Sequence, residues 1–143
     1  MVEIQVRYEG DLRCAAVHGP SKTELKTDAP VDNQGRGESF SPTDLVATAL
    51  GTCVLTTMGI VAKRHGWRLE GATATVVKHM VADPARRIGK LDVRVRMPAG
   101  LDARARETLE KTAHTCPVHK SLAPNVEIPM TFEWDAEPAP ARG

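Results

Sequence analysis

The segment that decides the fold of this chain begins with residues 41–53, SPTDLVATALGTC. It has the features of a helix start, because Ser41 can cap the helix, a proline fits the first helical position, and Asp44 follows the cap by three residues. Apolar residues then recur at helical spacing, and the opposite face carries threonines instead of charges. Gly66 follows the basic run at 63–65 and ends the helix. The sequence therefore predicts one long helix that is buried on most sides.

Short segments in which apolar and polar residues alternate flank this helix and predict strands. In chain order they lie near residues 2–8, 13–17, 23–27, 72–76, 91–97 and 126–134. A loop is predicted over residues 28–39, and Asp102 is predicted to cap a second helix that ends at Cys116. The order β-β-β-α-β-β-α-β, with antiparallel hairpins, indicates an α+β fold. We expect a single domain over residues 1–134 and a flexible tail over 135–143.

The composition excludes several classes of function. The net charge is +1 and aromatic residues make up 3% of the chain, so we expect no nucleic-acid partner and no anionic membrane partner. We also expect no segment apolar and long enough to cross a bilayer, and no signal peptide at the N-terminus. These features predict a cytoplasmic protein. In that compartment three cysteines do not form a structural disulfide framework, so any disulfide is expected to be transient and catalytic.

Two of the cysteines, Cys53 and Cys116, are 63 positions apart, each close to an end of a predicted helix. They are either buried packing thiols or a redox pair. Cys14 alternates with its neighbours on a predicted strand and is interpreted as structural. A third possibility is a zinc site, because Cys116 and His119 have a ligand-like spacing and Cys53 could join them. His119 could alternatively be a surface residue or influence the pKa of Cys116.

These residues resemble the OsmC/Ohr family of osmotically inducible protein C and organic hydroperoxide resistance proteins. The resemblance covers residues 2–134 and rests on FSPTDL at 40–45, ALGTC at 49–53 and TCPVH at 115–119. It implies antiparallel sheets wrapped around two long central helices in an intertwined homodimer. A partner chain would also supply the second layer that a helix this apolar needs, since one modest sheet covers only one side.

Membership would imply a thiol peroxidase that reduces organic hydroperoxides to alcohols in oxidative stress defence, with no metal or organic cofactor. By the match Cys53 is peroxidatic and forms a sulfenic acid, and Cys116 resolves it as a disulfide. A dithiol or lipoyl-type protein reductant would reopen the disulfide. The apolar helix wall formed by Leu50, Val54 and Met58 would suit a hydrophobic peroxide.

One departure from the family concerns the groups that activate the thiol. The well-characterised peroxidases use a glutamate near the start of the long helix and an arginine from a loop. Here the position ten before Cys53 is Thr43, and the acid is Asp44, nine before, as in an OsmC-like branch. We expect Asp44 to orient the arginine, with Arg36 the first choice for that arginine.

Arg13 is the second choice for the arginine, and Glu38 lies further upstream as another acid. Burial raises the pKa of a thiol, so a reactive cysteine in an apolar helix needs such a cation. Because of the departure at Thr43, a non-enzymatic redox-sensing or small-apolar-ligand-binding protein of the same fold stays as the alternative function.

Overall fold

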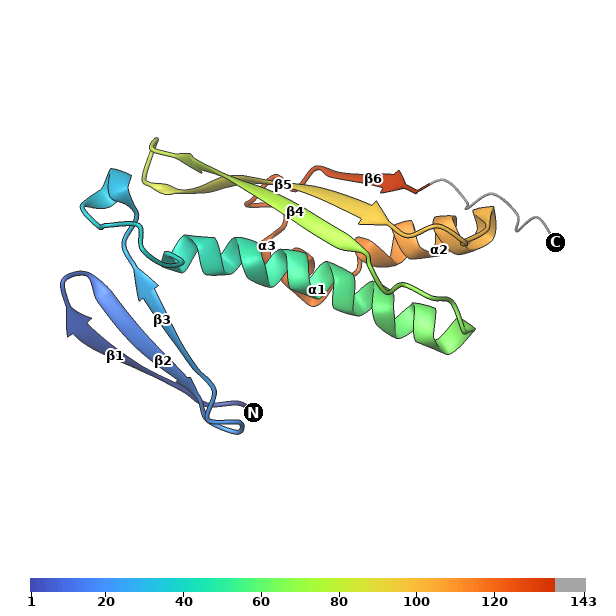
Figure 1. The fold of residues 1–143 in the computed structure, drawn as a ribbon. Coiled ribbons are helices and arrows are strands. Elements are labelled where there is room, and N and C mark those ends of the chain that lie inside the picture. The colour runs from blue at the N-terminus through green and yellow to red at the C-terminus, as the bar shows by residue number, and fades with distance from the viewer. Residues whose placement is uncertain (136–143) are drawn as a thin grey trace. The chain divides into compact units, whose positions relative to one another are not determined.

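A computed structural model describes residues 1–135, and the part of the predicted tail at 136–143 lies outside the described residues. The elements follow the order β1 (Ile4–Gly10), β2 (Arg13–His18), β3 (Glu24–Asp28), a 3-10 turn η1 (Val31–Asn33), α1 (Pro42–His65), β4 (Thr73–Val81), β5 (Arg87–Met97), α2 (Ala103–Ala113), α3 (Pro117–Leu122) and β6 (Met130–Trp134) (Figure 1). The predicted α+β class is confirmed. Contacts within the chain divide it into two compact units, Met1–Val46 and a second that begins at Ala47. The single domain over 1–134 stays a prediction.

The N-terminal unit is a three-stranded antiparallel sheet in the order β1-β2-β3. Strand register places Ile4, Val6 and Tyr8 of β1 on one face, and all three side chains are exposed. Leu25 of β3 shares this face through its pairing with Ala16. An apolar sheet face is therefore left open to solvent in the single chain.

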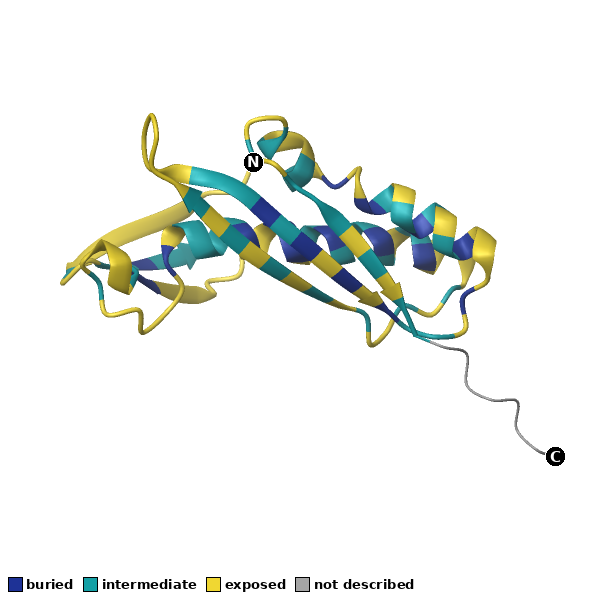
Figure 2. Ribbon diagram, turned by 90° about the horizontal axis from the view of Figure 1, so that it is seen from above, coloured by how far each residue is buried: buried dark blue, intermediate teal, exposed yellow. Residues whose placement is uncertain are grey.

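The C-terminal unit is a second three-stranded sheet, in the order β4-β5-β6, with helices packed against one of its faces (Figures 1 and 2). Strands β4 and β5 pair antiparallel, but β6 pairs parallel to β5. The expectation of antiparallel pairing throughout is wrong at this point, because α2 and α3 return the chain to the other end of the sheet before β6 begins. The predicted last strand is also shorter, since only an isolated bridge between Lys90 and Glu127 precedes Met130.

The core of this unit lies between the sheet and helices α1 and α2. It is formed by side chains that are at most 3% exposed: Leu50, Val54, Met58, Leu91, Val93, Val95, Met97, Leu101, Ala105, Leu109 and Ala113. At Gly51 the helix approaches β4 so closely that a Cβ atom would lie 3.0 Å from Val76 Cγ2. Alternate burial along β4 and β5 in Figure 2 marks the inner and outer faces of the sheet.

Two expectations about α1 are wrong. The helix is not buried on most sides within one chain, since Thr48, Thr52, Thr56 and Ile60 are exposed. By length and composition α1 is also apolar enough to cross a membrane, although no such segment was expected. Its inner face belongs to the core of the C-terminal unit, which accounts for much of that apolar character. The predicted helix end is confirmed, because Gly66 adopts a left-handed φ of 71° and the Trp67 N–H bonds back to Ala62 O at 2.9 Å.

Candidate active site

Cys53 lies in the middle of α1 and is half-buried. Its Sγ atom is 3.9 Å from the hydroxyl oxygen of Thr57, one helical turn further on. Since side chains four residues apart share one helix face, Thr57 and Cys53 point away from α1 in the same direction. The thiol is therefore accessible along one side of the helix, unlike the core residues of the opposite face.

Cys116 does not end α2, as the sequence predicted, but caps the separate short helix α3. Helix α2 stops at Ala113, and the chain turns before Pro117 opens α3 at the first helical position. The Cys116 Sγ atom accepts a hydrogen bond from the His119 N–H at 3.3 Å. The third helix was missed because cysteine is not a usual capping residue, although the Cys-Pro pair was a usable signal.

The structure brings the two thiols together across 63 positions of sequence. Cys116 is 0% exposed, and burial is the main cause that raises the pKa of its thiol. A hydrogen bond to the Cys53 side chain and the negative charge of Cys53 raise this pKa further, whereas the backbone N–H groups of His119 and Val118 lower it. Cys53 and Cys116 are both free thiols here, and so is Cys14 in the other unit. The peroxidatic and resolving roles stay predictions.

Asp44 belongs to the start of α1 and forms a capping box with Ser41. Its Oδ2 atom accepts from the Ser41 N–H at 2.9 Å, and its own N–H donates to Ser41 Oγ at 3.1 Å. Because these bonds stabilise the start of α1, helix capping alone explains why an acidic residue is found at position 44. The predicted role of Asp44 in orienting an arginine stays a prediction.

The two candidate arginines both lie in the N-terminal unit, in different surroundings. Arg36 is exposed in the loop between η1 and α1. Arg13 on β2 bonds to the Glu38 carboxylate and lies 3.5 Å from Asp28 Oδ2, and the Glu38 hydrogen bond is the main cause that raises its pKa. Asp28 was not predicted from the sequence. It is 1% exposed, and its Oδ1 atom has no partner among the described residues.

The zinc alternative is not supported by the arrangement of the side chains. No group of three or more His, Cys, Asp or Glu within residues 1–135 is placed to hold a metal ion. The ring of His119 instead packs edge-on against the ring of His114, with centroids 5.9 Å apart. Burial, followed by the charges of His114 and Lys120, lowers the pKa of His119. His119 affects the Cys116 pKa only through its backbone N–H.

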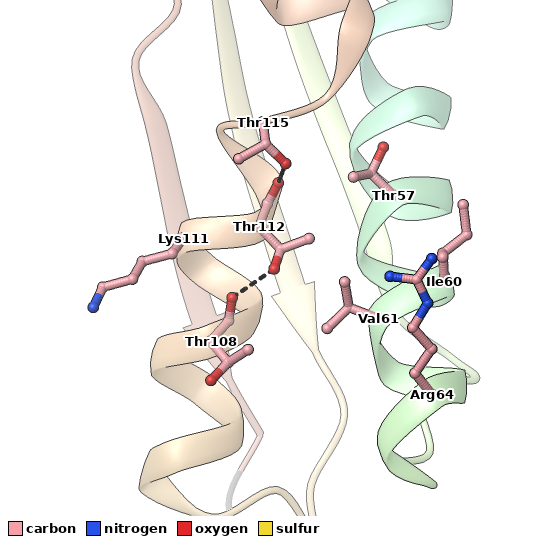
Figure 3. Close-up of a pocket in the computed structure, with 8 residues that line it drawn as sticks. All are labelled: Thr57, Ile60, Val61, Arg64, Thr108, Lys111, Thr112 and Thr115. Atoms are coloured by element: carbon pink, nitrogen blue, oxygen red, sulfur yellow. Dashed lines mark hydrogen bonds between the residues drawn. The ribbon is translucent and has the colours of Figure 1, made fainter.

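A groove of about 470 Å³ lies beside the thiol pair, between α1 and α2 (Figure 3). Its α1 wall is made of Thr57, Ile60, Val61 and Arg64, and four residues of or next to α2 complete it. The predicted substrate wall of Leu50, Val54 and Met58 is wrong, because these side chains are 0% exposed in the core. The helical periodicity identified the apolar face correctly, but that face is covered by the sheet.

Comparison with known proteins places these features in a family. The model of the family described as OsmC-like protein matches residues 35–131. A Psychrobacter arcticus 273-4 structure, provisionally named an osmotic stress induced and detoxification response protein, is 44% identical, with 93% of this chain and 96% of that chain covered and a TM-score of 0.87. No curated protein matches the chain.

Two more distant structures share the fold. One is the organic hydroperoxide resistance protein OsmC of Legionella pneumophila, 18% identical over 93% of this chain and 96% of its own, with a TM-score of 0.75. The other is an organic hydroperoxide resistance protein of Elizabethkingia anophelis, 16% identical over 94% of this chain and 96% of its own, with a TM-score of 0.76.

Proposed function

The chain belongs to the OsmC-like protein family, and we propose that it is a thiol peroxidase that reduces organic hydroperoxides to alcohols in oxidative stress defence. Membership and the names of its relatives support a stress-related, peroxidase-like role in general terms. The observation that carries the specific proposal is the asymmetry of the thiol pair. Cys53 is half-buried beside a groove, while Cys116 is fully buried near Cys53 and has a raised pKa. That arrangement suits an attacking thiol at Cys53 that the substrate can reach. It also suits a buried, protonated thiol at Cys116 that reacts only after Cys53 has been oxidised.

In the first step the Cys53 thiolate attacks the terminal oxygen of the hydroperoxide, the one that carries the hydrogen. A sulfur–oxygen bond forms as the O–O bond breaks, and the departing alkoxide takes up a proton and leaves as the alcohol. The Cys53 sulfur is oxidised by two electrons to a sulfenic acid, and the hydroperoxide is reduced by the same two electrons.

In the second step Cys116 loses its proton and attacks the Cys53 sulfur. The sulfenic hydroxyl leaves with that proton as water, and a Cys53–Cys116 disulfide forms. A dithiol or lipoyl-type protein then returns two electrons and two protons, which restores both thiols and closes the cycle. The influence of the Cys53 side chain on the Cys116 pKa supports this pairing, because it requires the two thiols to be neighbours.

The cation that favours the Cys53 thiolate is proposed to be an arginine. Arg36, oriented by Asp44, is the group predicted from the sequence, and its side chain is exposed. Arg13 is the alternative, and it is already fixed by Asp28 and Glu38. Either arginine could also donate a hydrogen bond to the peroxide oxygen as charge develops there.

We further propose a cytoplasmic homodimer in which a second copy covers the open apolar surfaces. The exposed Ile4, Val6 and Tyr8 of β1 form one such surface, and the exposed side of α1 forms another. Large apolar side chains on an open sheet face mark interaction sites. Light scattering that gives the 15.5 kDa mass of a monomer would overturn the dimer.

Mass spectrometry without reductant tests the proposed reaction. Reduced protein exposed to an organic hydroperoxide should lose two hydrogens, and peptide mapping should locate the loss to a Cys53–Cys116 link. Cys116→Ser should stop at an oxidised Cys53, Cys53→Ser should stay unreacted, and the control Cys14→Ser should behave as wild type. Thiols that persist in excess peroxide would contradict the proposal.

Other outcomes would favour the alternative of a non-enzymatic redox-sensing or small-apolar-ligand-binding protein, and persistent thiols fit only its ligand-binding form. Thr43 is the observation behind this alternative, because it stands where well-characterised family peroxidases would carry a glutamate, while the neighbouring Asp44 already serves the capping box. A sensor would form the disulfide once, without sustained turnover when a dithiol is supplied. Continuous peroxide consumption with dithiol therefore distinguishes the two functions.

A further inference from the structure

Residues 35–40 lie between η1 and α1 and are bonded at several positions to the chain at the end of strand β3. The Gly37 N–H donates to Ala29 O at 3.1 Å. Phe40 O accepts from the Asp28 N–H at 3.0 Å. Although most residues of this segment are exposed, its path is therefore set by β3 and the residue that follows it.

Two glycines of the segment fix the backbone on both sides of Arg36. A Cβ atom at Gly35 would lie 1.7 Å from Ala29 O, so a larger residue could not be placed there unless the backbone moved. Gly37 has a left-handed φ of 64°, a conformation that favours glycine. Because Arg36 lies between them in the sequence, its backbone position is determined by these close contacts.

The Asp28 side chain makes a further contact with the segment from inside the unit. It is 1% exposed, and its Oδ2 atom accepts a hydrogen bond from the Glu38 N–H at 3.0 Å. Arg13 lies 3.5 Å from the same Oδ2 atom and also bonds to the Glu38 carboxylate. These three residues, Asp28, Arg13 and Glu38, therefore form a clamp that holds the segment two positions beyond Arg36.

The clamp also has a purely structural explanation, because a backbone N–H in a folded protein needs an acceptor. A neutral acceptor would satisfy the Glu38 N–H without burial of a charge, which costs free energy. The Asp28 Oδ1 atom, moreover, has no partner among the described residues. What the negative charge adds is Arg13, which ties the Glu38 side chain to the same point as its backbone.

The clamp distinguishes the two arginines that were candidates for the cation that favours the Cys53 thiolate. The Arg13 guanidinium is shared by the carboxylates of Asp28 and Glu38, whose negative charges offset its own. Arg36 is exposed, and no hydrogen bond or ion pair joins its side chain to any residue within 1–135. The charge of Arg36 is therefore available to a thiolate, whereas that of Arg13 is used within the clamp.

We infer that Asp28 is a positioning residue for Arg36, because its clamp fixes the segment from which Arg36 acts on the Cys53 thiolate. Arg13 serves as the counter-ion of the clamp and not as the activating cation. Asp44 would still orient the guanidinium, while Asp28 sets the backbone that carries it. This inference rests on the proposed peroxidase function, in which Arg36 favours the thiolate.

The pH profile of Cys53 alkylation by iodoacetamide tests the inference on reduced, full-length protein, because the thiolate is the reactive form. Arg36→Gln should move the midpoint of the profile upward by roughly one pH unit. Asp28→Ala should move it to a similar extent, and Asp28→Asn, which keeps an acceptor for the Glu38 N–H, should move it less. The double variant should shift no further than Arg36→Gln alone, because both changes remove the action of one cation. Arg7→Gln in the same sheet is the control and should match wild type.

A second variant keeps the test decisive if Asp28→Ala does not fold. The exposed Ser39 hydroxyl donates to Lys26 O at 2.9 Å, so Ser39→Ala loosens the same segment and leaves the buried charge in place. Its midpoint should move in the same direction by a smaller amount. In the Arg36→Gln background Ser39→Ala should produce no shift, and a shift that persists there would contradict the inference.

The outcomes separate this inference from the function on which it rests. A wild-type profile in Arg36→Gln or in folded Asp28→Ala, or shifts of the two variants that add, would overturn the inference while the peroxidase function stands. A larger upward shift in Arg13→Gln than in Arg36→Gln would also overturn it and would make Arg13 the activating cation. If the profiles shift as expected but Cys53 resists organic hydroperoxides, the peroxidase function is overturned and the positioning role of Asp28 remains.

Discussion

The Cys116 sulfur accepts a hydrogen bond from the His119 N–H at 3.3 Å and is completely buried beside Cys53. This one atom therefore caps a helix and faces the thiol with which it is proposed to pair. The hydrogen bond from the His119 N–H lowers the Cys116 pKa, whereas burial raises it. Burial is the larger cause, so the pKa is raised. The Cys116 thiol is thus expected to be protonated in the resting protein, and its reactivity should depend on access as well as on pH.

Alkylation of the reduced protein should show this ordering. With iodoacetamide near pH 8, half-buried Cys53 should be labelled well before Cys116, and labelling of Cys116 should rise only at higher pH, where the thiolate forms. Peptide mass spectrometry over a pH series provides the measurement. Cys116 labelled as fast as Cys53 at every pH would show that burial does not protect it.

Substitution of Cys116 should reveal its capping role independently of any redox chemistry. Cys116→Ala removes the acceptor for the His119 N–H and should lower the free energy of unfolding by about 1 kcal/mol, as lost caps usually do. Cys116→Ser keeps an acceptor oxygen and should retain more stability than the alanine variant. Urea denaturation under reducing conditions gives both values. Equal losses in the two variants would mean that the cap contributes nothing measurable.

The local sequence was sufficient to predict most elements of the fold. The caps at Ser41 and Asp102 and the terminator Gly66 were identified correctly, because their hydrogen bonds involve residues only a few positions away. The parallel pairing of β6 could not be predicted in this way. It depends on the end of the sheet to which α2 and α3 bring the chain before β6, and that position is determined by how the whole unit packs.

The candidate site was predictable only in part, for a similar reason. Periodicity shows that α1 has an apolar face, but it does not show which face the sheet covers, so Leu50 was assigned to substrate and Thr57 was overlooked. Asp28 was missed because a lone aspartate at the end of a strand has no local signature of burial. Its place beside Arg13 arises from strand pairing, which joins residues distant in sequence.

Asp44 provides a test that separates helix capping from a role in catalysis. Asp44→Asn keeps an oxygen that can accept from the Ser41 N–H, whereas Asp44→Ala loses it and should cost about 1 kcal/mol of stability. If Asp44 also orients an arginine, Asp44→Asn should slow Cys53 oxidation while its unfolding curve stays close to wild type. An asparagine variant with the wild-type rate of oxidation would leave Asp44 with its capping role alone.

The close approach of α1 to β4 predicts different effects for two neighbouring substitutions. Leu50→Ala opens a cavity in the core and should cost roughly 2–5 kcal/mol. Gly51→Ala adds a methyl group that would meet Val76 Cγ2 at 3.0 Å, so the neighbour must shift by a few tenths of an ångström. We expect a smaller loss for Gly51→Ala, of roughly 1–3 kcal/mol from overpacking. Paired urea denaturation curves test the order, and a reversed order would show that the helix cannot move away from β4.

His119 should make stability depend on pH. Its pKa in the folded protein is lowered by burial, and its Nδ1 atom has no partner among the described residues, so protonation is opposed in the folded state. The unfolded chain binds the proton near the ordinary value of about 6.5. Below that pH the unfolded state therefore holds more protons, and the free energy of unfolding should fall until the pH drops below the lowered pKa. His119→Gln should flatten this decline between about pH 7 and 5 in urea denaturation, with His65→Gln as a matched histidine variant. A decline as steep in His119→Gln as in wild type would place its origin in other groups.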